Sequence, residues 1–167
     1  MKAIVIGAFV LLSLTLNAQH MKSPKDVVVG LFVATDERDW NTVLESFTTK
    51  VVLDYSSMTG NPATELNPED IVMAWKGILP GFESTHHQVG NFLEVIHNEK
   101  ATVFCYGTAA HYLTDETGNI WTVVGSYNFE VDKNSKGDWK ISKMKFNFKY
   151  QDGNTTLPEK AIANSKS

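Results

Sequence analysis

Four long stretches of alternating residues fill the C-terminal half of the chain and restrict its fold more than any other feature. They cover residues 85–97, 101–114, 120–132 and 139–150. A side-chain period of two is typical of strands that bury one face. Turn-forming residues at 98–100, 116–119 and 134–138 separate the stretches, and connections this short join antiparallel neighbours. The sequence therefore predicts a four-stranded antiparallel meander.

Helical patterns precede the meander. The expected elements are a helix from 24 to 36, a helix from 40 to 47, a strand from 51 to 56, a loop from 57 to 66 and a helix from 68 to 79. Ser23, Asp39 and Asn67 stand directly before the helices, where their side chains can cap the first turn. Helices followed by a meander predict an α+β domain with the helices packed on one face of a curved antiparallel sheet. Such a layered arrangement can leave a pocket between helices and sheet.

The two ends of the chain differ from its middle. Residues 1–18 have a positive start, an apolar run and a small-residue cleavage box, which predict a signal peptide and an exported, periplasmic or secreted protein. An uncleaved anchor helix is the alternative, but the apolar run is shorter than a membrane span requires. We expect no stable membrane anchor after cleavage, a domain over 19–150 and a loosely ordered polar tail over 151–167.

Charge and residue usage narrow the classes of partner. The net charge is -4, the pI is near 5.7, and Arg38 is the only arginine, which argues against a nucleic-acid partner. Cys105 is the only cysteine, so no intramolecular disulfide can form. The histidines lack the spacing of a metal site, and we expect neither a metal nor another cofactor.

Two adjacent histidines draw attention to the start of the first long strand. A period of two places His87 on the same side as Thr85 and Val89, and His86 on the opposite side. On the next strand His111 is in phase with a row of small residues, Val103, Cys105, Gly107 and Ala109, which would leave volume for a cavity. Asp36, from the first helix, and Tyr55, from the short strand, could meet the two imidazoles there.

The order of these residues resembles scytalone dehydratase and the SnoaL-like polyketide cyclases. The motifs are Thr35-Asp36-Glu37-Arg38-Asp39-Trp40, Val52-Leu53-Asp54-Tyr55, Thr85-His86-His87, His111 and Gly125-Ser126-Tyr127-Asn128. The resemblance covers about residues 25–150 and implies the cone-shaped α+β barrel shared with nuclear transport factor 2 and ketosteroid isomerase. It also implies that His87 is the general base, His111 its companion and Asp36 the carboxylate that orients the pair. Tyr55 would be the acid that polarises a substrate carbonyl through a water.

Further roles follow from the same resemblance. Ser126 and Asn128 would bind the substrate or orient its leaving hydroxyl. The dehydratase pattern has a second tyrosine directly before the aspartate, where this chain has Thr35. Threonine is shorter and less acidic, which disfavours scytalone itself as the substrate.

Two functions of different classes fit these features. The first is a metal-independent lyase or isomerase that acts on a small carbonyl-bearing cyclic or aromatic molecule by acid-base catalysis. The alternative is a noncatalytic module of the same fold that binds a small apolar ligand. Four aromatic residues, Phe104, Tyr106, Tyr127 and Phe129, are expected on the outer side of the sheet, where they could mark a homo-oligomer interface as easily as core.

Overall fold

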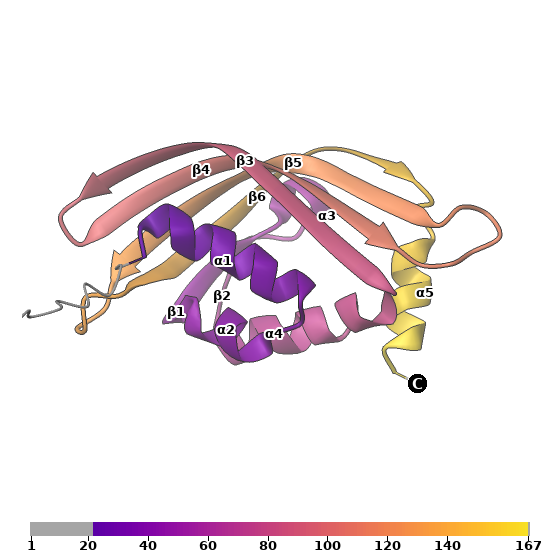
Figure 1. Cartoon of the computed structure of the whole chain (residues 1–167), viewed down its shortest axis with the longest axis horizontal. Helices are drawn as coiled ribbons and strands as arrows, with labels where there is room; N and C mark the ends of the chain where they lie inside the picture. The colour runs from indigo at the N-terminus through magenta and orange to yellow at the C-terminus, as the bar shows by residue number, and fades with distance from the viewer. Residues whose placement is uncertain (1–21, 167) are drawn as a thin grey trace, which may run out of the picture.

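The sheet arches over the first helix, as Figure 1 shows for this computed structural model. The structure describes residues 22–166, so the predicted signal peptide lies outside the described residues. The helices are α1 (Pro24–Asp36), α2 (Trp40–Glu45), α3 (Ser56–Thr59), α4 (Pro68–Lys76), the 3-10 helix η1 (Leu79–Gly81) and α5 (Leu157–Asn164). The strands are β1 (Phe47–Asp54), β2 (Thr64–Leu66), β3 (Ser84–His97), β4 (Lys100–Tyr112), β5 (Ile120–Lys133) and β6 (Trp139–Gly153).

The predicted meander is confirmed: β3, β4, β5 and β6 pair in sequence order, each antiparallel to the next. The sheet continues beyond them in the order β2-β1-β6-β5-β4-β3. β1 is parallel to β6, and β2 pairs antiparallel with β1 inside the segment expected to be a loop. The α+β fold class is therefore confirmed, with a mixed sheet that stays open instead of closing into a barrel.

Helix α1 provides most of the cover for the inner sheet face. Ser23 accepts a hydrogen bond from the backbone of Asp26, and the Asp26 carboxylate accepts one from the backbone of Ser23, which completes a capping box. Val28, Leu31 and Phe32 are buried against the strands. The helix ends at Asp36, and Arg38 adopts a left-handed backbone (φ 57°) that turns the chain into α2. This turn leaves the Asp36 carboxylate facing β3.

The strand β3 forms one edge of the sheet and is not straight. Its pairing with β4 shifts between Gly90 and Leu93, and Asn91 at this bulge has a positive φ of 55°. The N-terminal part of β3 lies beside the end of α1, where Thr85 and His87 contact Asp36. The bulge thus separates the portion of β3 that carries the histidines from its far end.

The C-terminal segment is ordered, so the expectation of a loose tail over 151–167 was wrong for its described part. Strand β6 runs to Gly153, and α5 buries Leu157 and Ala161 completely. The backbone of Ala161 lies so close to Gly81 that a Cβ on that glycine would be 1.8 Å from the Ala161 oxygen. Helix α5 therefore packs against η1. Within residues 22–166, no helix is long and apolar enough to cross a membrane.

Candidate active site

A cavity of about 150 Å³ lies between the helices and the inner sheet face. Aromatic and aliphatic side chains form most of its wall, among them Phe32 from α1, Trp75 from α4, and Trp121 and Phe146 from the sheet. Its polar groups include the two imidazoles of His87 and His111 and the two phenols of Tyr55 and Tyr127. No charged residue of the described chain lines it. The cavity therefore suits a small, uncharged and largely apolar molecule.

Asp36 forms a hydrogen-bonded pair with His87, which is the member of the pair that lines the cavity. His87 Nδ1 lies 2.7 Å from Asp36 Oδ1, and the backbone N–H of His87 donates to Oδ2 over 2.6 Å. Thr85 Oγ1 donates a further bond to Oδ1 over 2.9 Å. Because a carboxylate accepts, Nδ1 carries a proton, so in the neutral form of the ring the lone pair lies on Nε2.

The environment keeps the Asp36 carboxyl ionised. Burial favours a raised pKa, but the hydrogen bonds and charge of His87, together with the bond from Thr85, hold the pKa of Asp36 below its usual value. An ionised partner stabilises an imidazolium at His87 and fixes the orientation of the ring. The pair is thus arranged to accept a proton at Nε2.

His111 is the more deeply buried imidazole. Its ring centroid lies 4.9 Å from that of Phe82, 4.6 Å from that of Trp121 and 6.0 Å from that of His87. Nδ1 is 3.3 Å from the backbone oxygen of Trp121, which can only accept, so Nδ1 is the protonated nitrogen. Burial, and then repulsion from His87, lower the pKa of His111 to about 4. At neutral pH His111 is therefore uncharged and can offer Nε2 as an acceptor.

The buried neutral state of His111 predicts a stability that depends on pH. The folded pKa of about 4 lies below the unfolded value near 6.5, so protons bind to the unfolded chain first as the pH falls. The contribution of neutral His111 to the free energy of unfolding is fully present above about pH 6.5. We expect about 3 kcal/mol of this free energy to be lost as the pH falls toward 4. Urea unfolding of the wild type and His111→Asn at several pH values measures this effect. The free energy of unfolding should fall more steeply with decreasing pH in the wild type than in His111→Asn.

The surface histidine provides the control for that measurement. His86→Ala should retain the wild-type slope, because His86 is exposed on the other side of β3. Equal slopes for the wild type and His111→Asn would show that His111 does not titrate in this way.

Two tyrosines of the cavity wall pack against the same phenylalanine ring. Tyr55, directly after β1, packs against Phe146 with ring centroids 5.9 Å apart, and Tyr127 packs against the same ring at 4.9 Å. Burial raises the pKa of both hydroxyls, so each remains protonated. Both phenols can therefore donate a hydrogen bond to an oxygen of a bound molecule.

Ser126 and Asn128 do not join this cavity, contrary to the role that the family resemblance implied. Residues paired across an antiparallel ladder share a face, and Tyr127 pairs with the inward Cys105. Ser126 and Asn128 therefore point to the outer face, where the Asn147 side chain donates to the backbone oxygen of Ser126 and the Asn128 side-chain oxygen. The structure brings together Asp36, Tyr55, His87 and His111 but not the other two predicted residues.

Tyr127 is the cavity residue that the sequence interpretation missed. The side of β5 on which it lies could have been predicted from the sequence. An even number of residues separates Tyr127 from the apolar residues Trp121, Val123, Phe129 and Val131, so all five share one side, and all are buried. The same register corrects the expectation that Tyr127 and Phe129 face outward. Phe104 and Tyr106 do lie on the outer face.

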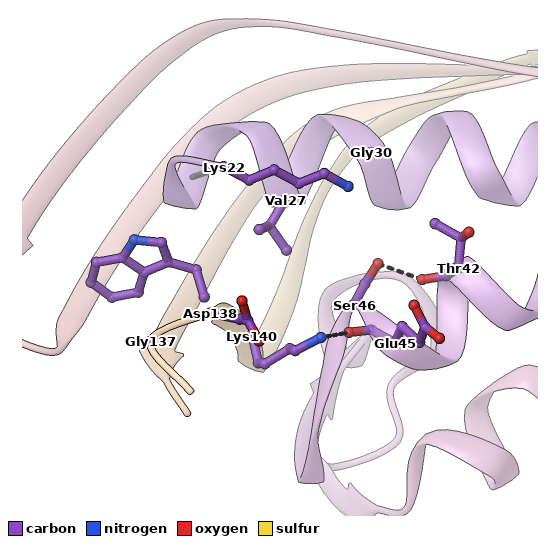
Figure 2. A pocket seen from close by; sticks show the side chains of 10 residues that line it. Lys22, Val27, Gly30, Thr42, Glu45, Ser46, Gly137, Asp138 and Lys140 are labelled. Atoms are coloured by element: carbon purple, nitrogen blue, oxygen red, sulfur yellow. Dashed lines mark hydrogen bonds between the residues drawn. The ribbon is translucent and has the colours of Figure 1, made fainter. Parts of the chain in front are cut away.

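A second and larger hollow lies away from these residues (Figure 2). Its volume is about 510 Å³, between the first turns of α1, the α2–β1 junction and the start of β6. The Ser46 hydroxyl donates to the backbone oxygen of Thr42, and the Lys140 ammonium to that of Glu45, so these polar groups bind backbone. Its lining includes none of the predicted site residues. The smaller cavity is therefore the candidate active site.

The histidines do not gather into a metal centre in the described chain. Between residues 22 and 166 no group of three or more His, Cys, Asp or Glu side chains is placed to hold one ion. His86 and His87 point to opposite sides of β3, as the alternation predicted.

Several solved structures share this fold. Kfla4162 from Kribbella flavida matches with a TM-score of 0.72 and 21% identity over 86% of this chain and 95% of that protein. A candidate scytalone dehydratase from Novosphingobium aromaticivorans matches with a TM-score of 0.67 and 18% identity, over 78% and 84%. The hexachlorocyclohexane dehydrochlorinase LinA-type3 from Novosphingobium barchaimii gives 0.62 and 15%, over 78% and 87%. Likeness at this level shows the fold.

The family is shown by the sequence itself. No curated protein matches the chain. Residues 24–145, more than half of the chain, match the model of the SnoaL-like domain. This span runs from the first residue of α1 into β6 and contains Asp36, Tyr55, His87 and His111. The predicted resemblance is confirmed, and the chain belongs to the SnoaL-like domain family.

Proposed function

We propose that the protein is a lyase or isomerase that removes a proton from carbon next to a carbonyl group of a small, uncharged cyclic or aromatic molecule. The observation that carries the proposal is the Asp36–His87 pair, hydrogen-bonded at 2.7 Å, beside a cavity that no charged side chain from residues 22–166 lines. A module that only holds an apolar ligand has no need of an imidazole fixed by a carboxylate. The pair therefore favours catalysis over simple binding.

We assign a role to each group on the basis of its position and hydrogen bonds. His87 Nε2 takes the proton, and Asp36 stabilises the imidazolium that forms. The electrons of the broken C–H bond pass to the carbonyl oxygen, which accepts a hydrogen bond from Tyr55 or Tyr127. Both hydroxyls remain protonated because burial raises their pKa values.

The second half of the reaction decides between the two classes. In a lyase the enolate electrons form a C=C bond and expel a hydroxyl from the neighbouring carbon, and the His87 imidazolium returns its proton to make water. In an isomerase the same proton returns to a different carbon. Neutral His111 can accept a hydrogen bond from a substrate hydroxyl and so hold it in place, while the His87 imidazolium supplies the proton with which that hydroxyl leaves as water. The dehydratase and dehydrochlorinase among the structural neighbours are in keeping with an elimination.

Asp36→Asn provides the test of the mechanism. Wild-type protein is incubated with a panel of small uncharged β-hydroxy ketones, and formation of the conjugated enone is followed by ultraviolet absorbance. An amide at position 36 carries one acceptor oxygen in place of two, so the His87 ring and backbone lose one of their partners. We expect kcat to fall about 10³-fold while the melting temperature changes little.

Two outcomes would count against the proposal. Full activity of Asp36→Asn would remove the carboxylate from the mechanism. Tight binding of panel compounds without any turnover would favour the ligand-binding alternative. The export signal over residues 1–18 stays a prediction, which the mass of the mature chain, starting at Gln19, would check.

A further inference from the structure

A side-chain hydrogen bond joins the end of α1 to the segment that leads into β3. Arg38, two residues after Asp36, donates from one guanidinium nitrogen, Nη2, to the backbone oxygen of Phe82 over 2.6 Å. The bond is partly buried and connects positions 44 residues apart in the sequence. A hydrogen bond from a charged donor is about twice as strong as a neutral one. Arg38 therefore holds the two segments together at this point.

Phe82 is connected to both imidazoles of the cavity. Its side chain is 1% exposed, and the centroid of its ring lies 4.9 Å from that of His111. Along the chain, Phe82 stands two residues before the start of β3, the strand that carries His87. A displacement of Phe82 would therefore change both the packing of His111 and the path of the chain into the His87 strand.

Arg38 is also fixed relative to Asp36. The backbone N–H of Arg38 donates to the oxygen of Thr35 over 3.2 Å, and that of Asp39 donates to the oxygen of Ala34 over 2.8 Å. These bonds fold the turn back onto the last turn of α1, with Arg38 in the left-handed backbone region. The Arg38 side chain and the Asp36 carboxylate thus extend from one hydrogen-bonded turn.

The bonds of Asp36 attach this turn to β3 at one point only. The Thr85 side chain and the ring and backbone of His87 all donate to the same carboxylate. Bonds that meet at one side chain leave the helix end free to rotate about that side chain. The Arg38–Phe82 bond adds a second, separate attachment. Together the two attachments oppose a rotation that would turn the Asp36 carboxylate away from His87.

We propose that Arg38 is a positioning residue, which keeps the Asp36–His87 pair in its productive geometry by fixing the end of α1 to the Phe82 segment. This role rests on the proposed function, since it assumes that the pair accepts the substrate proton. Arg38 does not line the cavity, so it acts through Asp36 and His87 instead of contacting the substrate. A displacement of reacting groups by about 1 Å can lower a rate about 100-fold, even when its cause is remote.

Arg38→Met tests the effect on the reaction. Methionine keeps a long unbranched side chain but donates no hydrogen bond. We expect kcat to fall about 30- to 100-fold and KM to stay within about threefold of the wild type, because the groups that contact the substrate remain. Arg38→Lys should bring kcat back to within about fivefold of the wild type, since a single nitrogen makes the bond and an ammonium can replace it.

The Nδ1–H proton of His87 provides a measurement that does not depend on turnover. In the wild type, proton NMR should show it as a downfield resonance that is absent from His87→Ala, because a charge-assisted hydrogen bond to a carboxylate deshields the proton. Arg38→Met should shift or broaden this resonance, and Arg38→Lys should retain it. Circular dichroism should show an unchanged fold, because Arg38 is only partly buried. Arg38→Gln, whose amide is too short to reach Phe82, repeats the test if methionine prevents folding.

Lys140→Met is the matched control. The Lys140 ammonium also donates to a backbone oxygen, that of Glu45, but in the larger hollow away from the cavity (Figure 2). Its loss should leave both kcat and the His87 resonance unchanged. Wild-type kcat in Arg38→Met, an unchanged resonance in that variant, or equal effects of Arg38→Met and Lys140→Met would overturn the positioning role. If the wild type converts no compound of the panel but the resonance changes in Arg38→Met alone, the proposed function fails while the positioning of the pair by Arg38 stands.

Discussion

His87→Ala is expected to lower kcat about 10³- to 10⁴-fold with a much smaller effect on KM. Alanine removes the nitrogen that accepts the substrate proton, and the neutral His111, whose pKa is lowered to about 4, is a weak base in its place. The ring of His87 also stacks on Phe32, with centroids 5.3 Å apart, so part of one cavity wall is lost. Steady-state kinetics on the compounds that the wild type converts measure the change.

The adjacent histidine is a matched control for this substitution. His86→Ala removes the imidazole of the neighbouring residue. The His86 side chain points to the outer side of the sheet, and the residue pairs with Ala110 on β4. Its kcat should stay within about twofold of the wild type, since a surface substitution removes no partner of the reacting groups. Equal losses in His86→Ala and His87→Ala would point to a damaged strand instead of a missing base. An unchanged kcat in His87→Ala would place the base elsewhere.

Gly81→Ala is expected to lower the free energy of unfolding by about 2–4 kcal/mol. The new Cβ would lie 1.8 Å from the backbone oxygen of Ala161 and 2.5 Å from its carbonyl carbon. Backbone atoms of a packed helix can move aside only if the helix itself moves. Moving α5 away would expose Leu157, which is completely buried. Since η1 contributes Leu79 to the cavity wall, KM should rise as well. Urea denaturation and steady-state kinetics measure the two effects.

Gly30→Ala is the contrasting change. Gly30 lies within α1, and a Cβ there would meet nothing within 4 Å. Alanine in place of glycine inside a helix should add up to about 1 kcal/mol to the free energy of unfolding. If Gly81→Ala proved as stable as Gly30→Ala, the contact between α5 and η1 would not hold the C-terminal helix in place.

The sequence predicted those parts of the fold in which local pattern and packing agree. The four strands of the meander were predicted within a few residues, because strict alternation and short turns allow one arrangement. The same alternation placed His87 inward, His86 outward and His111 on a row of small buried residues, as the structure shows. The contact of Asp36 with His87 was harder to predict, because no local pattern indicates that the end of a helix will contact a strand 51 residues later.

The errors arose where a short motif competed with the wider pattern. Ser126 and Asn128 were placed in the cavity from a family motif, although the buried Val123 and Val131 set the opposite phase for β5. Helix α5 was missed because only two residues of a largely polar segment, Leu157 and Ala161, are buried. Gly81, which Ala161 contacts, is also remote in the sequence. The parallel pairing of β1 with β6 depends on contacts that no local pattern reveals.

The bulge at Asn91 has a consequence for solubility. Strand β3 is an edge of the sheet, and a straight edge offers its unpaired backbone groups to strands of other molecules, which can lead to open-ended fibrils. The shift between Gly90 and Leu93 and the positive φ of Asn91 bend that edge out of line. Growth of the sheet by strand addition is thereby discouraged at the edge where Leu93 and Val95 are exposed.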